Sequence, residues 1–229
     1  MQISKIDIDG NTTVRNCVKC GGTGNIIVHD GKPRPTKNPD RTVRFSRSVL
    51  CECRRNELVE NTYPALRNPR LPKISSELAE KFAAQYPLTK DFWFEGSLDQ
   101  FLIAVKAAFV YHRKSSKFMG HVSNGLDIVQ NYYVEQPKDS ERRFLDLVNF
   151  RDLVVIIANT RVSNVAVPTC VVELIQGRQT IGKATWIYTT NDFDACMEYS
   201  DNLKTLLGDF SHVELKSLAA SKPKMKGVL

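Results

Sequence analysis

The sequence predicts an α/β protein, with a small N-terminal four-cysteine module followed by a layered domain that has a mostly parallel sheet. Three observations carry this prediction. Strand-like apolar runs alternate with helix-like segments over residues 75–216, an order typical of parallel sheets covered by helices. Residues 153–158 form an uninterrupted apolar run rich in β-branched side chains, as expected for a strand buried on both faces. Four of the six cysteines lie within residues 17–53.

Size and composition narrow the class of protein. The 229 residues suit one domain of ordinary size plus a small module, and a hydrophobic content of 42% is too high for a disordered chain. No apolar run approaches the roughly 20 residues that span a bilayer. Residues 1–9 carry acids where a signal peptide has its apolar stretch. We therefore expect no membrane partner and a cytoplasmic location, where disulfide frameworks are rare.

Four segments are expected along the chain. They are a zinc-binding module (1–60), a proline-containing linker (61–74), the α/β domain (75–216) and a basic flexible tail (217–229). In the module, strands are expected at residues 25–28 and 42–45, on either side of a loop rich in glycine and proline.

Helix and strand signals alternate through the α/β domain. Ser75 can cap a first helix, in which Leu78 and Phe82 share one face, and Pro87 ends it. By apolar spacing, further helices are expected at 97–112, 126–133, 140–147, 167–178 and 193–207. Strands are expected at 91–95, 120–122, 153–158, 184–190 and 212–216.

The cysteines form two close pairs. Cys17 and Cys20 are separated by two residues and followed by Gly-Gly-Thr-Gly, which lets the backbone turn tightly around a bound metal. Cys51 and Cys53 present a second pair of sulfurs. Four thiolates around a tetrahedral Zn²⁺ ion is the natural closure of two such pairs. Reduced thiols in a loose segment, a redox pair and an iron–sulfur cluster are the alternatives.

Basic residues gather around the cysteines. The first 70 residues hold 13 basic and 7 acidic residues, so most of the net charge of +7 lies there. We expect a basic rim of nucleic-acid-binding side chains: Lys32, Arg34, Lys37, Arg41, Arg44, Arg47, Arg54 and Arg55. A rim of this kind commonly contacts phosphates. Contact with an acidic protein is the alternative.

Several segments resemble one known family. Cys17–Gly24 and Cys51–Arg54 are similar to the Cys-x-x-Cys-Gly-x-x-Gly and Cys-x-Cys-Arg segments of bacterial and phage replicative-helicase loaders, the primosomal AAA+ ATPases. Residues 152–159 fall where that family has its Walker B strand. Residues 173–191 resemble the helix and strand that end in the sensor asparagine, here Asn191. The resemblance implies an AAA-like fold, a replicative helicase as partner and a phage origin.

The nucleotide-binding motifs of that family are degenerate in this chain. The turn expected to hold phosphate, residues 94–101, keeps Gly96 but has no lysine, and its two acids would repel phosphate. Ile157 and Ala158 stand where the Walker B acids belong. We therefore predict a pseudo-ATPase that has no catalytic residues and binds no nucleotide.

These observations together predict a non-catalytic DNA-replication accessory protein. It would bind a replicative helicase or another replisome protein, and single-stranded DNA, in the host cytoplasm if a phage encodes it. An inhibitor or decoy that binds the host helicase or its loader without a DNA role is the alternative. An enzyme whose site the sequence does not reveal is a third. DNA affinity that falls steeply with salt would favour the first.

Overall fold

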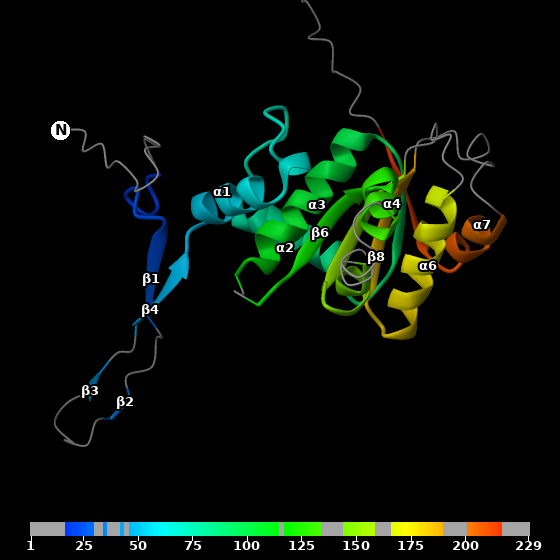
Figure 1. The fold of residues 1–229 in the computed structure, drawn as a ribbon. Helices are drawn as coiled ribbons and strands as arrows, with labels where there is room; N and C mark the ends of the chain where they lie inside the picture. Colours follow the sequence, from blue (N-terminus) through cyan, green and yellow to red (C-terminus); the bar gives the residue numbers. More distant parts are fainter. Residues whose placement is uncertain are drawn as a thin grey trace, which may run out of the picture.

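The computed structural model describes residues 17–29, 34–35, 42–43, 46–114, 117–133, 144–158, 166–189 and 201–216. A five-stranded sheet lies at the centre of the larger body, and a two-stranded hairpin that carries the cysteines projects from it (Figure 1). The predicted fold class is confirmed. Among the described helices, none is long and apolar enough to cross a membrane.

The strands of the central sheet all run parallel, in the order β6-β7-β8-β5-β9. Their bounds are β5 (Phe92–Gly96), β6 (Gly120–Asn124), β7 (Leu153–Ile157), β8 (Ala184–Thr189) and β9 (Ser211–Leu215). Of these five strands, β5 comes first in the chain, but in the sheet it lies between β8 and β9. The strand order therefore reverses beside β5. In open α/β sheets the carboxyl end of a strand at such a reversal is the usual ligand site.

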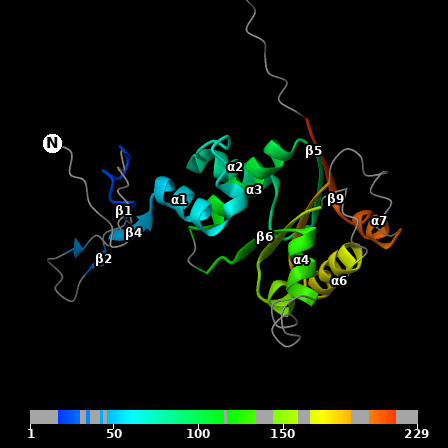
Figure 2. The same cartoon turned by 45° about the horizontal axis from the view of Figure 1, so that its top comes forward.

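Helices cover both faces of the sheet. Side chains of β7 alternate between two apolar clusters: Leu153 and Val155 join one, and Val154 and Ile156 join the other. The first cluster packs under α1 (Glu52–Thr62), α2 (Ser76–Gln85) and α3 (Leu98–His112). The second packs under α4 (Gly125–Tyr133), a helical turn at 144–149, α6 (Ala166–Thr180) and α7 (Asp201–Leu207). Figure 2 shows the two sets of helices on either side of the sheet.

The elements of the α/β domain follow the predicted order, with ends that differ by a few residues. The last predicted helix, 193–207, is described only from residue 201 onwards. The sensor residue Asn191 and the tail 217–229 lie outside the described residues.

The cysteine module is a β-hairpin. β1 (Asn25–His29) pairs antiparallel with β4 (Ser46–Leu50), and β2 (Arg34–Pro35) pairs with β3 (Thr42–Val43) further out. The partner of the first strand therefore begins at residue 46, and the expectation of a strand at 42–45 is only partly met. The reason is the register. Leu50 lies opposite Asn25, and this brings the second cysteine pair beside the first.

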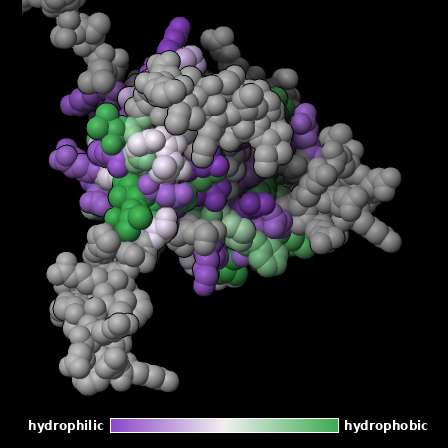
Figure 3. Space-filling view, turned by 90° about the vertical axis from the view of Figure 1, so that its left-hand side faces the viewer, coloured by the Kyte–Doolittle hydropathy of each residue, from purple (hydrophilic) through white to green (hydrophobic). Residues whose placement is uncertain are grey.

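The hairpin buries little apolar surface of its own. Val18, Ile27 and Leu50 are all exposed, Val18 completely. Figure 3 views the molecule from the hairpin's side and shows small apolar groups set among hydrophilic residues. A two-stranded hairpin without an apolar core is marginally stable at best, so its order must depend on another interaction.

Residues 61–74 do not behave as a free linker. Tyr63, Leu66, Leu71 and Ile74 are buried in the first apolar cluster, and the segment includes η1 (Pro64–Leu66). The buried Lys106 of α3 donates a 2.9 Å hydrogen bond to a backbone carbonyl of this segment. Prolines are compatible with a free linker or with an extended segment that packs against a domain. Because the apolar side chains between the prolines are buried in the core, this segment packs against the domain.

Candidate metal centre

The first cysteine pair lies on a turn made by glycines. Gly21, Gly22 and Gly24 have φ angles of 56°, 81° and 76°, in the left-handed region that glycine adopts without strain. The chain folds back on itself there, and the Gly24 N–H donates to Cys20 Sγ at 3.3 Å. The Gly-Gly-Thr-Gly sequence therefore wraps the backbone around a sulfur, as the sequence predicts.

The second pair lies at the start of α1. Cys51 is the N-cap residue of this helix, and Cys53 is in its first turn. The backbone N–H of Cys51 donates to the carbonyl of Gly24 at 2.9 Å. This bond joins the glycine turn to the start of the helix and, with the pairing of β1 and β4, brings the two pairs of sulfurs together.

The four sulfurs fit a tetrahedral metal ion. Cys17 Sγ lies 3.7 Å from Cys51 Sγ, and Cys20 Sγ lies 3.6 Å from Cys53 Sγ. All four atoms lie within 4.8 Å of one another. Zinc–sulfur bonds of about 2.3 Å in a tetrahedron place neighbouring sulfurs roughly 3.8 Å apart. A set of four thiolates leaves no open coordination position, which is typical of structural zinc.

The local electrostatics favour a bound cation. Burial raises the pKa of the Cys51 and Cys53 thiols. Burial acts in the same direction on Cys20, but the N–H of Gly24 and the neighbouring thiols outweigh it and lower the pKa of Cys20 to about 7. One thiolate, that of Cys20, is therefore accessible near neutral pH, whereas Cys51 and Cys53 need a positive charge beside them. Metal binding supplies that charge and releases the protons.

Of the eight basic residues expected in the rim, the side chains of two are described, Arg54 and Arg55. Arg54 is partly exposed and forms an ion pair with Glu57 at 3.0 Å. Arg55 is 4% exposed, and it donates to Val110 O at 3.3 Å and to Ser76 Oγ at 2.8 Å. The expectation that Arg55 contacts nucleic acid is therefore wrong, because its position on α1 faces α2 and α3.

The other members of the expected rim lie outside the residues whose side chains are described: Lys32, Arg34, Lys37, Arg41, Arg44 and Arg47.

Glu52, between the two cysteines of the second pair, joins the module to the α/β domain. Its carboxylate accepts bonds from the backbone N–H and the hydroxyl of Ser76, both at 3.0 Å, at the start of α2. Lys19 of the glycine turn pairs with the same carboxylate at 2.6 Å. The hydrogen bond from Lys19 is the largest cause of the lowered pKa of Glu52. Sequence analysis missed this residue, and its place between two ligand candidates was the signal available.

The carboxyl end of β5 is the expected nucleotide position, and its backbone is closed. One residue, Ser97, separates β5 from α3. Ser97 Oγ accepts from Gln100 N at 3.4 Å, and Ser97 N donates to Leu215 O at 3.0 Å. The carbonyl of Gly96 accepts from the Tyr188 hydroxyl at 2.6 Å. A phosphate loop needs several N–H groups that face the ligand, whereas in this short turn the N–H groups of Ser97 and Gln100 bond to the protein.

Apolar and paired side chains surround this turn. Ala158, at the end of β7, is 3% exposed, and its N–H donates to Tyr188 O at 2.9 Å. On the other side of β5, Glu95 Oε2 lies 3.1 Å from His212 Nε2, and the His212 ring lies against Trp93 with 4.3 Å between ring centroids. Glu95, one of the two acids of this turn, thus contacts a histidine.

Comparison with known proteins supports the fold. No protein-family model matches the chain, and no curated protein matches its sequence. Among solved structures, a DnaC helicase loader aligns with a TM-score of 0.50 and 16% identity over 69% of this chain and 99% of the loader. Replication initiator DnaA bound to AMPPCP and single-stranded DNA aligns with a TM-score of 0.50 and 15% identity, over 61% of this chain. DnaA from Aquifex aeolicus gives a TM-score of 0.51 at 12% identity, also over 61% of this chain.

The chain spans less than half of these DnaA chains, 44% and 45%. At such low identity the likeness establishes an AAA-like fold.

Proposed function

We propose that this chain is a non-catalytic replication accessory protein, which binds a replicative helicase and helps to place it on single-stranded DNA. The observation that carries the proposal is the fold likeness to a helicase loader over almost the whole of that loader. A second protein of similar fold, the replication initiator DnaA, has a solved structure with single-stranded DNA bound. A cytoplasmic location follows from this role.

The proposed mechanism divides the work between two units. The hairpin, held by one Zn²⁺ ion on Cys17, Cys20, Cys51 and Cys53, presents the basic rim to DNA. The α/β domain serves as the platform for the helicase. The Glu52–Ser76 contact supports this division, because it ties the metal site to the start of α2 and so fixes the hairpin relative to the domain.

Nucleotide plays no part in the proposed mechanism. The closed turn after β5 supports this, together with the apolar side chains at the end of β7. A missing lysine and missing acids each remove large electrostatic contributions to phosphate and Mg²⁺ binding. ATP–Mg²⁺ should shift none of the backbone amides of residues 96–101 in NMR spectra of the zinc-loaded protein, and ATP binding at this turn with a micromolar dissociation constant would overturn this part of the proposal.

The DNA role is tested by a charge-matched pair of variants. Arg41, Arg44 and Arg47 are changed together to Ala, and a control changes the exposed Lys81, Lys90 and Lys216 of the α/β domain to Ala. Binding to fluorescent oligo(dT) is measured over a range of salt concentrations by anisotropy. The first variant should weaken binding, with a log–log salt slope reduced by roughly 0.7 per lost phosphate contact. The control should bind as the unmodified protein does.

The helicase role is tested by copurification, with the unmodified chain and with the same triple arginine variant. The replicative helicase of the native host should copurify with the chain, and binding should persist in the triple arginine variant. Helicase binding by a chain that has no affinity for DNA at any salt concentration would contradict the loader proposal and favour an inhibitor. Failure to capture a helicase or another replisome protein would contradict both.

A further inference from the structure

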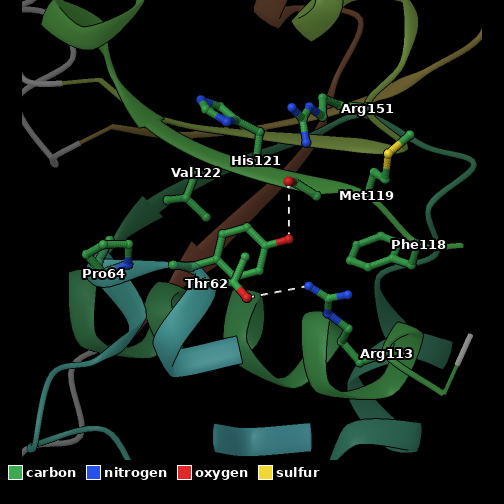
Figure 4. Close-up of a pocket in the computed structure, with 11 residues that line it drawn as sticks. Thr62, Pro64, Arg113, Phe118, Met119, His121, Val122 and Arg151 are labelled. Carbon is green, nitrogen blue, oxygen red and sulfur yellow. Dashed lines mark hydrogen bonds between the residues drawn. The ribbon is translucent and has the colours of Figure 1, made fainter. Parts of the chain in front are cut away.

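A pocket of about 400 Å³ opens at the amino end of β6 (Figure 4). It is bounded by the end of α1, by η1, by the residue after α3, by residues 118–122 just before and at the start of β6, and by a residue just before β7. Because the strands are parallel, this is the opposite end of the sheet from the turn between β5 and α3. The pocket is therefore separate from the nucleotide position of the fold and from the metal centre.

Two arginines approach the pocket from opposite sides. Arg113 follows the end of α3, and Arg151 precedes β7 (Figure 4). The described residues that line the pocket include no aspartate or glutamate. Burial raises the pKa of the Tyr63 phenol in the pocket, and the charges of both guanidinium groups act against that rise. The Tyr63 hydroxyl donates to the carbonyl of Gly120 at 3.2 Å.

The two guanidinium groups are incompletely used by the protein. Arg151 donates from Nε at 3.1 Å and from Nη2 at 2.6 Å to Asp146, a residue that does not line the pocket, and its Nη1, which bonds to none of the described residues, is left to bond a ligand. Arg113 donates one long bond, 3.5 Å, to Thr62 Oγ1. Its Nε is buried, and it has no hydrogen-bond partner within the described part of the chain. A buried charged donor without a partner is costly, and an anion in the pocket would remove that cost.

The shape of the ligand follows from the arrangement of its donors. A phosphate presents oxygens in several directions, so it can accept bonds from guanidinium groups on opposite sides. A carboxylate is planar and pairs best with one guanidinium side by side. Pro64, Phe118 and Val122 add apolar lining, and the volume falls within the range of small-molecule sites. These features suit a phosphate attached to a larger organic group.

His121 adds a neutral polar group to the same pocket. Burial lowers its pKa to about 4, so the ring is neutral at pH 7. Its Nε2 is buried and has no partner among the described residues. A neutral imidazole nitrogen can donate or accept a hydrogen bond, and here it can serve a sugar or base.

We propose that this pocket binds the phosphate of a nucleotide-sized ligand between Arg113 and Arg151, with the apolar lining against its sugar or base. The phosphate belongs either to a free mononucleotide or to one nucleotide of a single DNA strand. The site needs neither the helicase nor the basic rim, so it stands or falls separately from the proposed function.

The test titrates the full zinc-loaded chain with dTMP, with oligo(dT) and with a glutamate-rich peptide, followed by NMR of the backbone amides of residues 118–122. Arg113→Gln and Arg151→Gln are compared with Lys216→Gln, which removes one positive charge at the other end of the sheet. dTMP should shift the amides of residues 118–122. Each arginine variant should weaken this binding by about tenfold or more, as expected for a lost charge-assisted hydrogen bond, whereas Lys216→Gln should not.

The probes distinguish the two sources of the phosphate. Equal affinity for dTMP and oligo(dT) assigns the site to free nucleotides, and much tighter binding of oligo(dT) at these amides assigns it to a DNA strand. Three results would overturn the proposal. They are no shift with either probe at about 10 mM, far above ordinary dissociation constants; dTMP binding unchanged by Arg113→Gln; and binding of the acidic peptide alone.

Discussion

Removal of the metal is expected to unfold the cysteine hairpin while the α/β domain stays folded. The described strands of the hairpin have exposed apolar side chains, so we expect them to depend on bonds between the four sulfurs and the proposed ion. Structural zinc contributes on the order of 10 kcal/mol to the folding of small modules. Cys20→Ser removes one ligand and the sulfur that accepts from Gly24.

The cost to the α/β domain can be worked out from the contacts at the start of α1. Disorder of the hairpin releases Lys19 from Glu52, an exposed ion pair worth about 0–1 kcal/mol. It also endangers the bonds from Ser76 to Glu52, where a hydrogen bond to a charged group contributes about 1.5–3 kcal/mol. The rest of α1 remains packed, because Val59 is fully buried. Loss of the ion pair and of both bonds from Ser76 would together cost about 3–7 kcal/mol, so we expect the domain to lose no more than about 7 kcal/mol.

The tryptophans give a direct assay. The chain has two, Trp93 in β5 and Trp186 in β8, and the hairpin has none. Urea unfolding followed by tryptophan fluorescence therefore reports on the α/β domain alone, and hydrogen exchange of residues 24–29 reports on the hairpin. Val18→Ser, in the same turn and fully exposed, is the matched control and should keep both units stable with zinc bound.

Two results would refute this reasoning. The first is loss of the cooperative tryptophan transition in Cys20→Ser, or a decrease well beyond the expected limit. That would mean that the module and the domain fold as one unit. The second is a hairpin that stays protected from exchange after chelation of the metal, which would show that the strands are stable without it.

Three further substitutions test the α/β domain, each by urea unfolding. Arg178 is fully buried and donates to three backbone carbonyls at 2.6–3.0 Å, so Arg178→Met should cost about 3–5 kcal/mol, whereas the exposed Arg67→Met should change stability by less than about 0.5 kcal/mol. Gly120→Ala would place a methyl group 2.7 Å from Phe109 Cζ and should cost about 1–3 kcal/mol. Lys106 Nζ lies 2.8 Å from Glu60 Oε1. Lys106→Met leaves this carboxylate without its buried partner and should cost about 2 kcal/mol or more.

Local signals carried most of the fold prediction. The apolar run at residues 153–158 is a central strand because β-branched side chains on both faces suit only a strand covered on both sides. Ser75 begins the helix that its capping hydroxyl predicts, and its Oγ accepts from Leu78 N at 3.2 Å. Both features depend only on residues that are close together in the chain, so the sequence alone is enough to predict them.

The errors arose where a residue's role depends on which face it presents. Arg55 belongs to a basic stretch, but the register of α1 turns it toward α3, where it bonds to Val110 O. Residues 61–74 contain prolines, but their apolar side chains meet a core built by other elements. Charge counts and proline counts carry no information on direction, so neither could separate surface from interior.

By itself, the sequence determined the alternation of strands and helices and the two cysteine pairs with their glycine turn. Each is a property of residues close together in the chain. Only the tertiary structure decided that Glu52 ties the metal site to α2, that the turn after β5 is closed by Tyr188 and Leu215, and that Arg113 and Arg151 share a pocket. These contacts join residues far apart in the chain, and the packing of helices on the sheet sets their distances.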